Sequence, residues 1–280
     1  MKTILLPTDF STTAKHAADF ALTLAQTIEA KIIFLNVIQY IPDTSSINIP
    51  MPSSQIYEAA EENAEIAMES FRESCLARYS EIESNVPTIE TKVVYGGVSR
   101  TILDVAEDLN VDMIVMGTFG EKDLLDKVFG SNSLYVAKNA KCPVWVIPQE
   151  IKLHSIKNIV YATDLEGDEV AIIQKSIDIA EMLGANIHAL HIHEENEPEI
   201  FSSKGIIKEI KKKLGTNMVV FSTLHRGDIV DGIETYMKNQ HSDALIVAHE
   251  HKGWLDRLFY KSILTQLTNH AKIPVLILQK

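Results

Sequence analysis

Short apolar runs alternate along the first half of the chain with longer segments in which apolar positions recur every three or four residues. Runs rich in Ile, Val and Leu are typical of strands buried on both faces of a parallel sheet, and the longer segments are typical of amphipathic helices. We expect strands at residues 3–6, 32–38, 88–95, 112–116 and 144–148. Helices are expected at 11–30, with Ser11 as the N-cap, and at 55–84, 99–109 and 131–139.

The second half of the chain repeats this alternation. We expect strands at residues 159–162, 186–191, 218–223, 244–248 and 275–278. Helices are expected at 169–183, 204–214, 228–239 and 260–270. Regular alternation of strands and helices predicts an α/β fold in which helices cover both faces of a parallel sheet.

Two stretches of the first half recur in the second with related sequences. The sequence KTILLPTD at residues 2–9 returns as KNIVYATD at 157–164, and AKCPV at 140–144 returns as AKIPV at 271–275. A chain of 280 residues is long enough for two domains of ordinary size. We therefore expect two versions of one fold, residues 1–150 and 151–280, with a linker at 149–156.

Glycines follow the fourth strand of the first domain with a defined spacing. Gly117 ends the strand, Gly120 follows, and Gly130-Ser131 opens the next helix, which gives the pattern G-x2-G-x9-G-S. The carboxyl ends of parallel strands form the ligand edge of such a sheet. Glycines let the backbone bring bare N–H groups up to an anion, and the first N–H groups of a helix lack intrahelical partners. The pattern therefore predicts a phosphate site.

The glycine spacing, together with KTILLPTDFS at residues 2–11, resembles the universal stress protein family, whose ATP-binding members carry G-x2-G-x9-G-[ST]. For each domain the resemblance implies a Rossmann-like or flavodoxin-like, doubly wound sheet of five parallel strands in the order 3-2-1-4-5. In this family the fifth strand often pairs between protomers. By the same pairing, strands 144–148 and 275–278 would join the two domains around a pseudo-twofold axis, and a homodimer remains open.

The resemblance also implies which residues hold an adenine nucleotide in the first domain: ATP, or ADP or AMP, with or without Mg²⁺. The residues that match the family's positions are Pro7, Thr8 and Asp9 beside adenine and ribose, Val37 at adenine, and Gly117, Gly120, Gly130, Ser131, Asn132 and Ser133 at the ribose and phosphates. Simpler roles stay open for some of them. Asp9 precedes a helix and would serve as a cap, and Ser131 and Ser133 would serve as capping residues as well.

Several features argue against an efficient catalyst. The chain has no G-x4-G-K-[ST], and hence no lysine committed to the β- and γ-phosphates and no hydroxyl placed for Mg²⁺ as in P-loop enzymes. Lys122 and Lys127 lie between the glycines, either near phosphate or as exposed helix lysines. Hydrolysis, if any, is expected to be slow.

The second domain departs from the glycine pattern. Aligned on residues 271–275, the glycine positions become Ala248, His251 and Lys261, with Ser262 retained; Tyr260 replaces the third glycine in the neighbouring alignment. Side chains there would occupy the space of the phosphates, so we expect a degenerate domain.

The second domain is rich in histidine instead. His191 and His193 end one strand and His249 and His251 follow another, so these pairs could meet Asp164 at the ligand edge. Imidazole and carboxylate groups are zinc ligands, which makes a zinc site one interpretation and a pH-sensitive interface or ordinary core and surface histidines the others.

Charge and cysteine content narrow the range of partners. The net charge of −12 argues against nucleic acid as a binding partner, because phosphate backbones bind basic surfaces. Residues 1–150 carry 11 Lys and Arg against 21 Asp and Glu, a balance of −10, so phosphate affinity must be local. With two cysteines, no signal peptide and no long apolar run, we expect a cytoplasmic protein that does not span a membrane.

Three functions remain in view. The leading hypothesis is a stress-response regulatory protein whose ATP occupancy in the first domain changes a surface that unidentified protein partners read. The alternatives are a slow ATPase or phosphotransferase on the same site, and a scaffold that binds no nucleotide and acts through dimerisation. A phosphorylated receiver domain is disfavoured, because the third strand ends in Gly96-Gly97 and the fifth in Pro148, where a receiver needs Asp and Lys.

Overall fold

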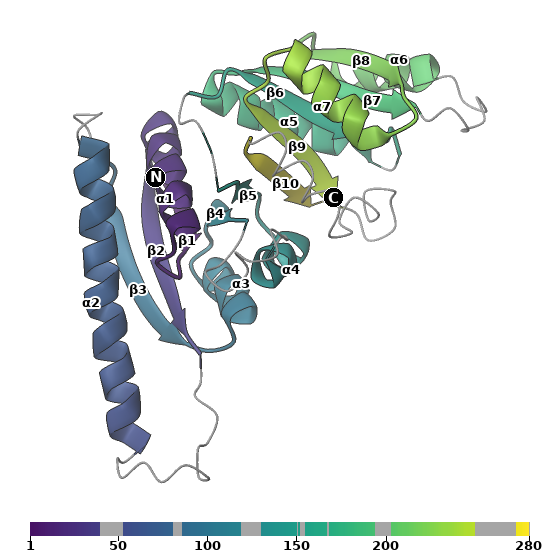
Figure 1. Ribbon diagram of the computed structural model, residues 1–280. Helices are drawn as coiled ribbons and strands as arrows, with labels where there is room; N and C mark the ends of the chain where they lie inside the picture. The colour runs from purple at the N-terminus through teal and green to yellow at the C-terminus, as the bar shows by residue number, and fades with distance from the viewer. Residues whose placement is uncertain are drawn as a thin grey trace.

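The computed structural model describes residues 1–39, 53–80, 86–118, 130–149, 151, 155–166, 168–193, 203–249 and 273–279. Its centre is a ten-stranded sheet flanked by helices (Figure 1). The strands are β1 (Lys2–Pro7), β2 (Ala30–Ile38), β3 (Ile89–Tyr95), β4 (Met113–Gly117), β5 (Val144–Ile147), β6 (Asn158–Thr163), β7 (Asn186–His193), β8 (Val219–His225), β9 (Ala244–His249) and β10 (Val275–Gln279). The helices are α1 (Thr12–Ile28), α2 (Ser53–Ser80), α3 (Val98–Asp108), α4 (Ser131–Asn139), α5 (Glu169–Leu183), α6 (Ser203–Leu214) and α7 (Ile229–Asn239).

The strand order confirms the predicted topology in both halves. The sheet runs β3-β2-β1-β4-β5-β10-β9-β6-β7-β8, so each half has the order 3-2-1-4-5. Pairing within each half is parallel. The two fifth strands, β5 and β10, pair with each other antiparallel, with Leu276 opposite Trp145. This pairing, also predicted, joins the two five-stranded units edge to edge.

Helices cover both faces of the sheet, as expected for a doubly wound fold. One face packs against α1, α2, α5 and α6, and the other packs against α3, α4 and α7. Successive strand residues point to opposite faces, which places Trp145 in the first core and its neighbours Val144 and Val146 in the second. The central strands β4 (MIVMG) and β5 (VWVI) are buried on both faces and are therefore apolar, whereas the edge strand β3 (IETKVVY) carries exposed polar residues.

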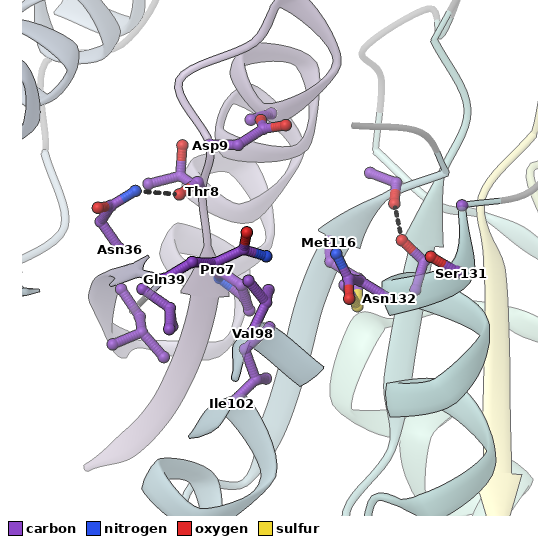
Figure 2. Close-up of a pocket in the computed structure, with 16 residues that line it drawn as sticks. Pro7, Thr8, Asp9, Asn36, Gln39, Val98, Ile102, Met116, Ser131 and Asn132 are labelled. Atoms are coloured by element: carbon purple, nitrogen blue, oxygen red, sulfur yellow. Dashed lines mark hydrogen bonds between the residues drawn. The ribbon is translucent and has the colours of Figure 1, made fainter. Parts of the chain in front are cut away.

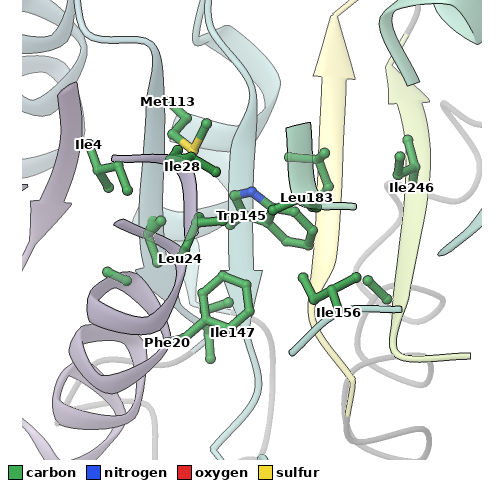
Figure 3. Close-up of a cluster of buried hydrophobic side chains, with 14 of the residues drawn as sticks. Ile4, Phe20, Leu24, Ile28, Met113, Trp145, Ile147, Ile156, Leu183 and Ile246 are labelled. Atoms are coloured by element: carbon green, nitrogen blue, oxygen red, sulfur yellow. The ribbon is translucent and has the colours of Figure 1, made fainter. Parts of the chain in front are cut away.

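The two halves share one core at their junction. Trp145 of β5 is 1% exposed and lies 5.3 Å from Phe20 of α1 between ring centroids. On the far side of the junction Ile156, Leu183 and Ile246 belong to the same buried cluster, as Figure 3 shows. The halves are therefore held together by apolar packing as well as by the strand pairing.

Many element boundaries differ from those predicted by one or two residues, those of α2 and β7 among them. The long helix α2 is described from Ser53 to Ser80, whereas we expected 55–84; residues 81–85 lie outside the described residues. Strand β7 continues to His193, beyond the expected end at 191, because His193 still pairs with His225 of β8. The predicted helix at 260–270 also lies outside the described residues.

Among the helices that the structure describes, none has the length and apolar character needed to cross a lipid bilayer.

Candidate functional site

A cavity of about 480 Å³ opens at the carboxyl ends of β1, β2 and β4, where the chain enters α1, α3 and α4 (Figure 2). Ligand pockets are commonly a few hundred cubic ångströms in size. Of the ten residues predicted to hold a nucleotide, nine line this cavity, and Gly120 lies outside the described residues. The nine are Pro7, Thr8, Asp9, Val37, Gly117, Gly130, Ser131, Asn132 and Ser133.

The turn between β1 and α1 is built from local hydrogen bonds. Thr8 Oγ1 accepts from the backbone N–H of Phe10 at 3.0 Å, and Asp9 Oδ1 accepts from that of Ser11 at 3.1 Å. Phe10 has φ +65°, a left-handed conformation that costs a non-glycine residue about 1–2 kcal/mol. Ser11 caps α1 by accepting from Ala14 N at 3.2 Å, as predicted. Asp9 thus shapes the turn without being the helix cap, and it borders the cavity.

The motif glycines have separate structural reasons. At Gly117 a Cβ atom would lie 2.6 Å from Thr13 Cγ2, so this position must be glycine for α1 to pack against β4. Gly130 is the N-cap of α4 with φ −60° and ψ 140°, a conformation that any residue can adopt. Close packing therefore accounts for Gly117, whereas backbone conformation does not require glycine at Gly130.

Two hydrogen bonds bring the ends of the glycine segment together. Gly130 N donates to Thr118 O at 2.7 Å, and Ser133 Oγ donates to Gly117 O at 2.7 Å. The hydroxyl of Ser133 therefore ties α4 to β4 instead of capping its own helix. Residues 119–129, which include Lys122 and Lys127, lie outside the described residues.

The N-terminus of α4 faces the cavity without a capping side chain. Its N-cap Gly130 makes no side-chain cap hydrogen bond, and Ser131 and Asn132 in its first turn line the cavity. Asn132 Oδ1 accepts from Ser99 Oγ at 2.6 Å, so the start of α3 lies beside the start of α4. Open helix N-termini carry unpaired N–H groups and a partial positive charge, and both favour an anion.

One part of the cavity is apolar and was missed by sequence reasoning. Leu35 and Met116 lie near the ends of β2 and β4, and Val98 and Ile102 come from the first turns of α3. The available signal was position alone: these residues follow Gly96-Gly97 or end a strand at the ligand edge. Ala14, Asn36 and Gln39 also line the cavity and were not predicted.

The described lining residues offer little positive charge. Asp9 is the charged side chain among them, and they include no Lys, Arg or His. A phosphate group in this cavity would therefore depend on backbone N–H groups and on the α4 dipole, as the acidic composition of this half suggested.

The second half contains the same turn after its first strand. Thr163 Oγ1 accepts from Leu165 N at 2.9 Å and Asp164 Oδ1 accepts from Glu166 N at 3.0 Å, with Leu165 at φ +61°. The internal repeat KNIVYATD therefore specifies the same local backbone as KTILLPTD.

The second half differs from the first where the cavity would be. Strand register places Ala248 of β9 where Gly117 stands in β4, as the alignment predicted. The residue that matches Ala14 is Glu169, which is 3% exposed and accepts hydrogen bonds from the hydroxyls of Tyr161 and Thr163. Burial and the neighbouring Glu169 raise the pKa of Tyr161 well above its usual value. A buried carboxylate thus lies where the first half has a methyl group; sequence reasoning did not single it out.

The histidines of the second half lie in different settings. His191 and His193 rings are 6.5 Å apart between centroids, and the His193 ring is 5.0 Å from His225. His249 is buried at the end of β9. Among the described residues no group of three or more His, Cys, Asp or Glu side chains is placed to hold a metal ion. His251 lies outside the described residues, as do Tyr260, Lys261 and Ser262, so the four-histidine zinc site stays a prediction.

Comparison with known proteins identifies the family. The sequence model of the universal stress protein family matches this chain twice, at residues 1–148 and 155–279. The chain therefore belongs to the universal stress protein family, with two of its domains in tandem.

Relatives and solved structures agree with this assignment. Universal stress protein Sll1654 of Synechocystis is 32% identical over 147 residues, which cover 52% of this chain and 85% of that protein. Universal stress protein MJ0531 of Methanocaldococcus jannaschii is 30% identical over 151 residues, 54% of this chain and 84% of that protein. The fold matches a universal stress protein structure from Archaeoglobus fulgidus with a TM-score of 0.68 at 17% identity, over 99% of this chain and 96% of that one.

Proposed function

We propose that this protein is a stress-response regulatory protein that binds an adenine nucleotide, ATP or its diphosphate or monophosphate, in the N-terminal half. The observation that carries the proposal is that one cavity is lined by both ends of the glycine motif and by the β1–α1 turn. These are the segments on which the family resemblance rests. Nucleotide occupancy would then alter a surface that a protein partner reads.

The cavity has a place for each part of the nucleotide. Val37, with apolar neighbours such as Val98 and Met116, supplies a slot for the base. Pro7, Thr8 and Asp9 lie beside it, and the Asp9 carboxylate can accept hydrogen bonds from ribose hydroxyls.

The phosphates belong at the other end of the cavity. Gly130, Ser131, Asn132 and Ser133 present the uncapped start of α4, and Gly117 with Gly120 completes the motif. Because the described lining residues carry no cationic side chain, Mg²⁺ would supply part of the charge that balances a triphosphate.

We assign one nucleotide to each chain. In the second half Ala248 replaces the first glycine and the Glu169 carboxylate replaces a methyl group. The carboxylate of Glu169, in addition to that of Asp164, would repel phosphate. The domains at residues 1–150 and 151–280 therefore have different roles in this proposal, binding in the first and scaffolding in the second.

Calorimetric titration with ATP and Mg²⁺ tests the proposal. Wild type and Gly205→Val, a glycine-to-valine change at an exposed position of α6, are expected to bind with equal affinity. Gly130→Val is expected to lose binding, since its side chain fills the phosphate end of the cavity. Equal heats for all three proteins, or no heat from wild type, would overturn the proposal.

A further inference from the structure

The β1–α1 turn is fixed from outside by a side chain of the neighbouring strand. Asn36 of β2 donates from its side-chain Nδ2 to the backbone carbonyl of Thr8 at 2.8 Å, which Figure 2 shows as a dashed line. The N–H of Thr8 in turn donates to Leu35 O at 2.8 Å. Both backbone polar groups of Thr8 are thus held by β2, directly before the turn that carries Asp9.

The second half makes the same contact with a different residue. His191 of β7 lies 3.1 Å from Thr163 O through its Nδ1, and since a carbonyl can only accept, Nδ1 is the donor. The registers of β1 with β2 and of β6 with β7 are the same when residue numbers are shifted by the repeat, so that His191 stands where Asn36 stands. Two chemically different side chains therefore preserve one hydrogen bond.

Because two different side chains make the same hydrogen bond, we infer that the turn requires the bond itself rather than a particular residue. In both halves it is made to the carbonyl of the threonine whose hydroxyl holds the left-handed residue, Phe10 or Leu165. A strained turn persists only when its surroundings hold it in place. The contact from the neighbouring strand is one such restraint, and in the first half it borders the cavity.

We propose that Asn36 is a positioning residue for the nucleotide site, acting through the carbonyl of Thr8 to hold the Thr8-Asp9 turn in its binding conformation. This inference rests on the proposed function. If the turn is already ordered before the ligand binds, the affinity is not reduced by the entropic cost of ordering it. Asn36 itself lines the cavity, but its proposed role is to place Asp9 beside the ribose rather than to contact the ligand.

Three full-length variants test the proposal by titration with ATP and Mg²⁺. Asn36→Leu keeps the approximate volume and removes the donor. Asn36→His installs the residue that makes the bond in the second half. Asn139→Leu is the matched control, because Asn139 Nδ2 donates to Tyr135 O at 2.7 Å in an exposed part of α4 outside this cavity.

We expect Asn36→Leu to weaken ATP binding about three- to tenfold, the effect of losing one hydrogen bond. Asn36→His should restore wild-type affinity to within about twofold, and Asn139→Leu should leave it unchanged. Hydrogen exchange without ligand gives a second readout. The N–H groups of Phe10 and Ser11 should exchange faster in Asn36→Leu than in wild type, and the increase should exceed any increase at the other amides, which reports overall stability.

The outcomes separate this inference from the proposed function. Wild-type affinity in Asn36→Leu, or an equal loss in Asn36→His, would overturn the positioning role while ATP binding stands. Unchanged exchange at Phe10 and Ser11, relative to the remaining amides, would also overturn it. Absence of ATP binding in wild type would refute the proposed function and this inference together.

Discussion

Replacing Gly117 by alanine tests how the start of the glycine motif is built. The new Cβ would lie 2.6 Å from Thr13 Cγ2 and 3.3 Å from Thr13 O, whereas ordinary contacts begin at 3.4 Å. Thr13 is 1% exposed in α1, so its side chain has no room to turn away. Helix α1 and strand β4 must therefore separate by a large fraction of an ångström.

Overpacking of this kind typically costs about 1–3 kcal/mol of folding free energy. Serine at position 13 removes the methyl group that makes the closest contact and leaves the 3.3 Å approach to the backbone oxygen. We therefore expect Gly117→Ala to cost about 2 kcal/mol in the wild-type background and less than about 1 kcal/mol in the Thr13→Ser background.

Equilibrium urea unfolding of the four proteins without nucleotide measures this coupling. The difference between the two costs should be about 1 kcal/mol or more, in the direction of relief by Thr13→Ser. An equal cost of Gly117→Ala in both backgrounds would refute the packing explanation. A cost that appears only in the presence of ATP would instead assign Gly117 to the ligand.

Three further predictions address other sites. Gly130→Asp supplies a cap for α4, so the stability of the unliganded protein should rise by about 0.3–1 kcal/mol while its ATP affinity falls at least tenfold. Gly130→Asn supplies a neutral cap and should lose less affinity. Lower stability in both variants would count against the cap assignment. Glu169→Ala orphans the hydroxyls of Tyr161 and Thr163 and should lower the free energy of unfolding by about 2–4 kcal/mol in urea; a change below about 0.5 kcal/mol would contradict this. Burial raises the pKa of Cys142 from 9.0 to about 11, so iodoacetamide should modify this thiol about 100-fold more slowly at pH 8 than it modifies a cysteine of an unfolded chain. The stability that the buried thiol contributes below pH 9 should be lost as the pH rises through 11. Labelling of the folded protein at the unfolded rate would refute this burial.

Much of the fold could be predicted because its signals are local and repeated. The apolar runs and amphipathic segments located every strand and helix that the structure describes, with small errors at the ends. Family resemblance supplied the strand order and the pairing of β5 with β10, which hydrophobic periodicity alone does not specify. The extension of β7 to His193 was missed because histidine carries no strong strand signal, and pairing with β8 decides it.

The candidate site was only partly predictable. Gly130 could be located from the glycine spacing, and Asp9 from the family resemblance of the segment that contains it. Asn36 could not, because its role depends on strand register: it reaches Thr8 only through the pairing of β2 with β1. Glu169 was missed for a related reason, since an acidic residue at a helix start is ordinarily exposed.

Native mass spectrometry of the full-length protein with ATP and Mg²⁺ tests the central claim most directly. The account predicts saturation at one adenine nucleotide for each wild-type chain, and no bound nucleotide for Gly130→Val at matched concentrations. Two nucleotides for each chain would contradict the assignment of binding to the N-terminal half alone. No nucleotide on the wild-type chain would contradict the account as a whole.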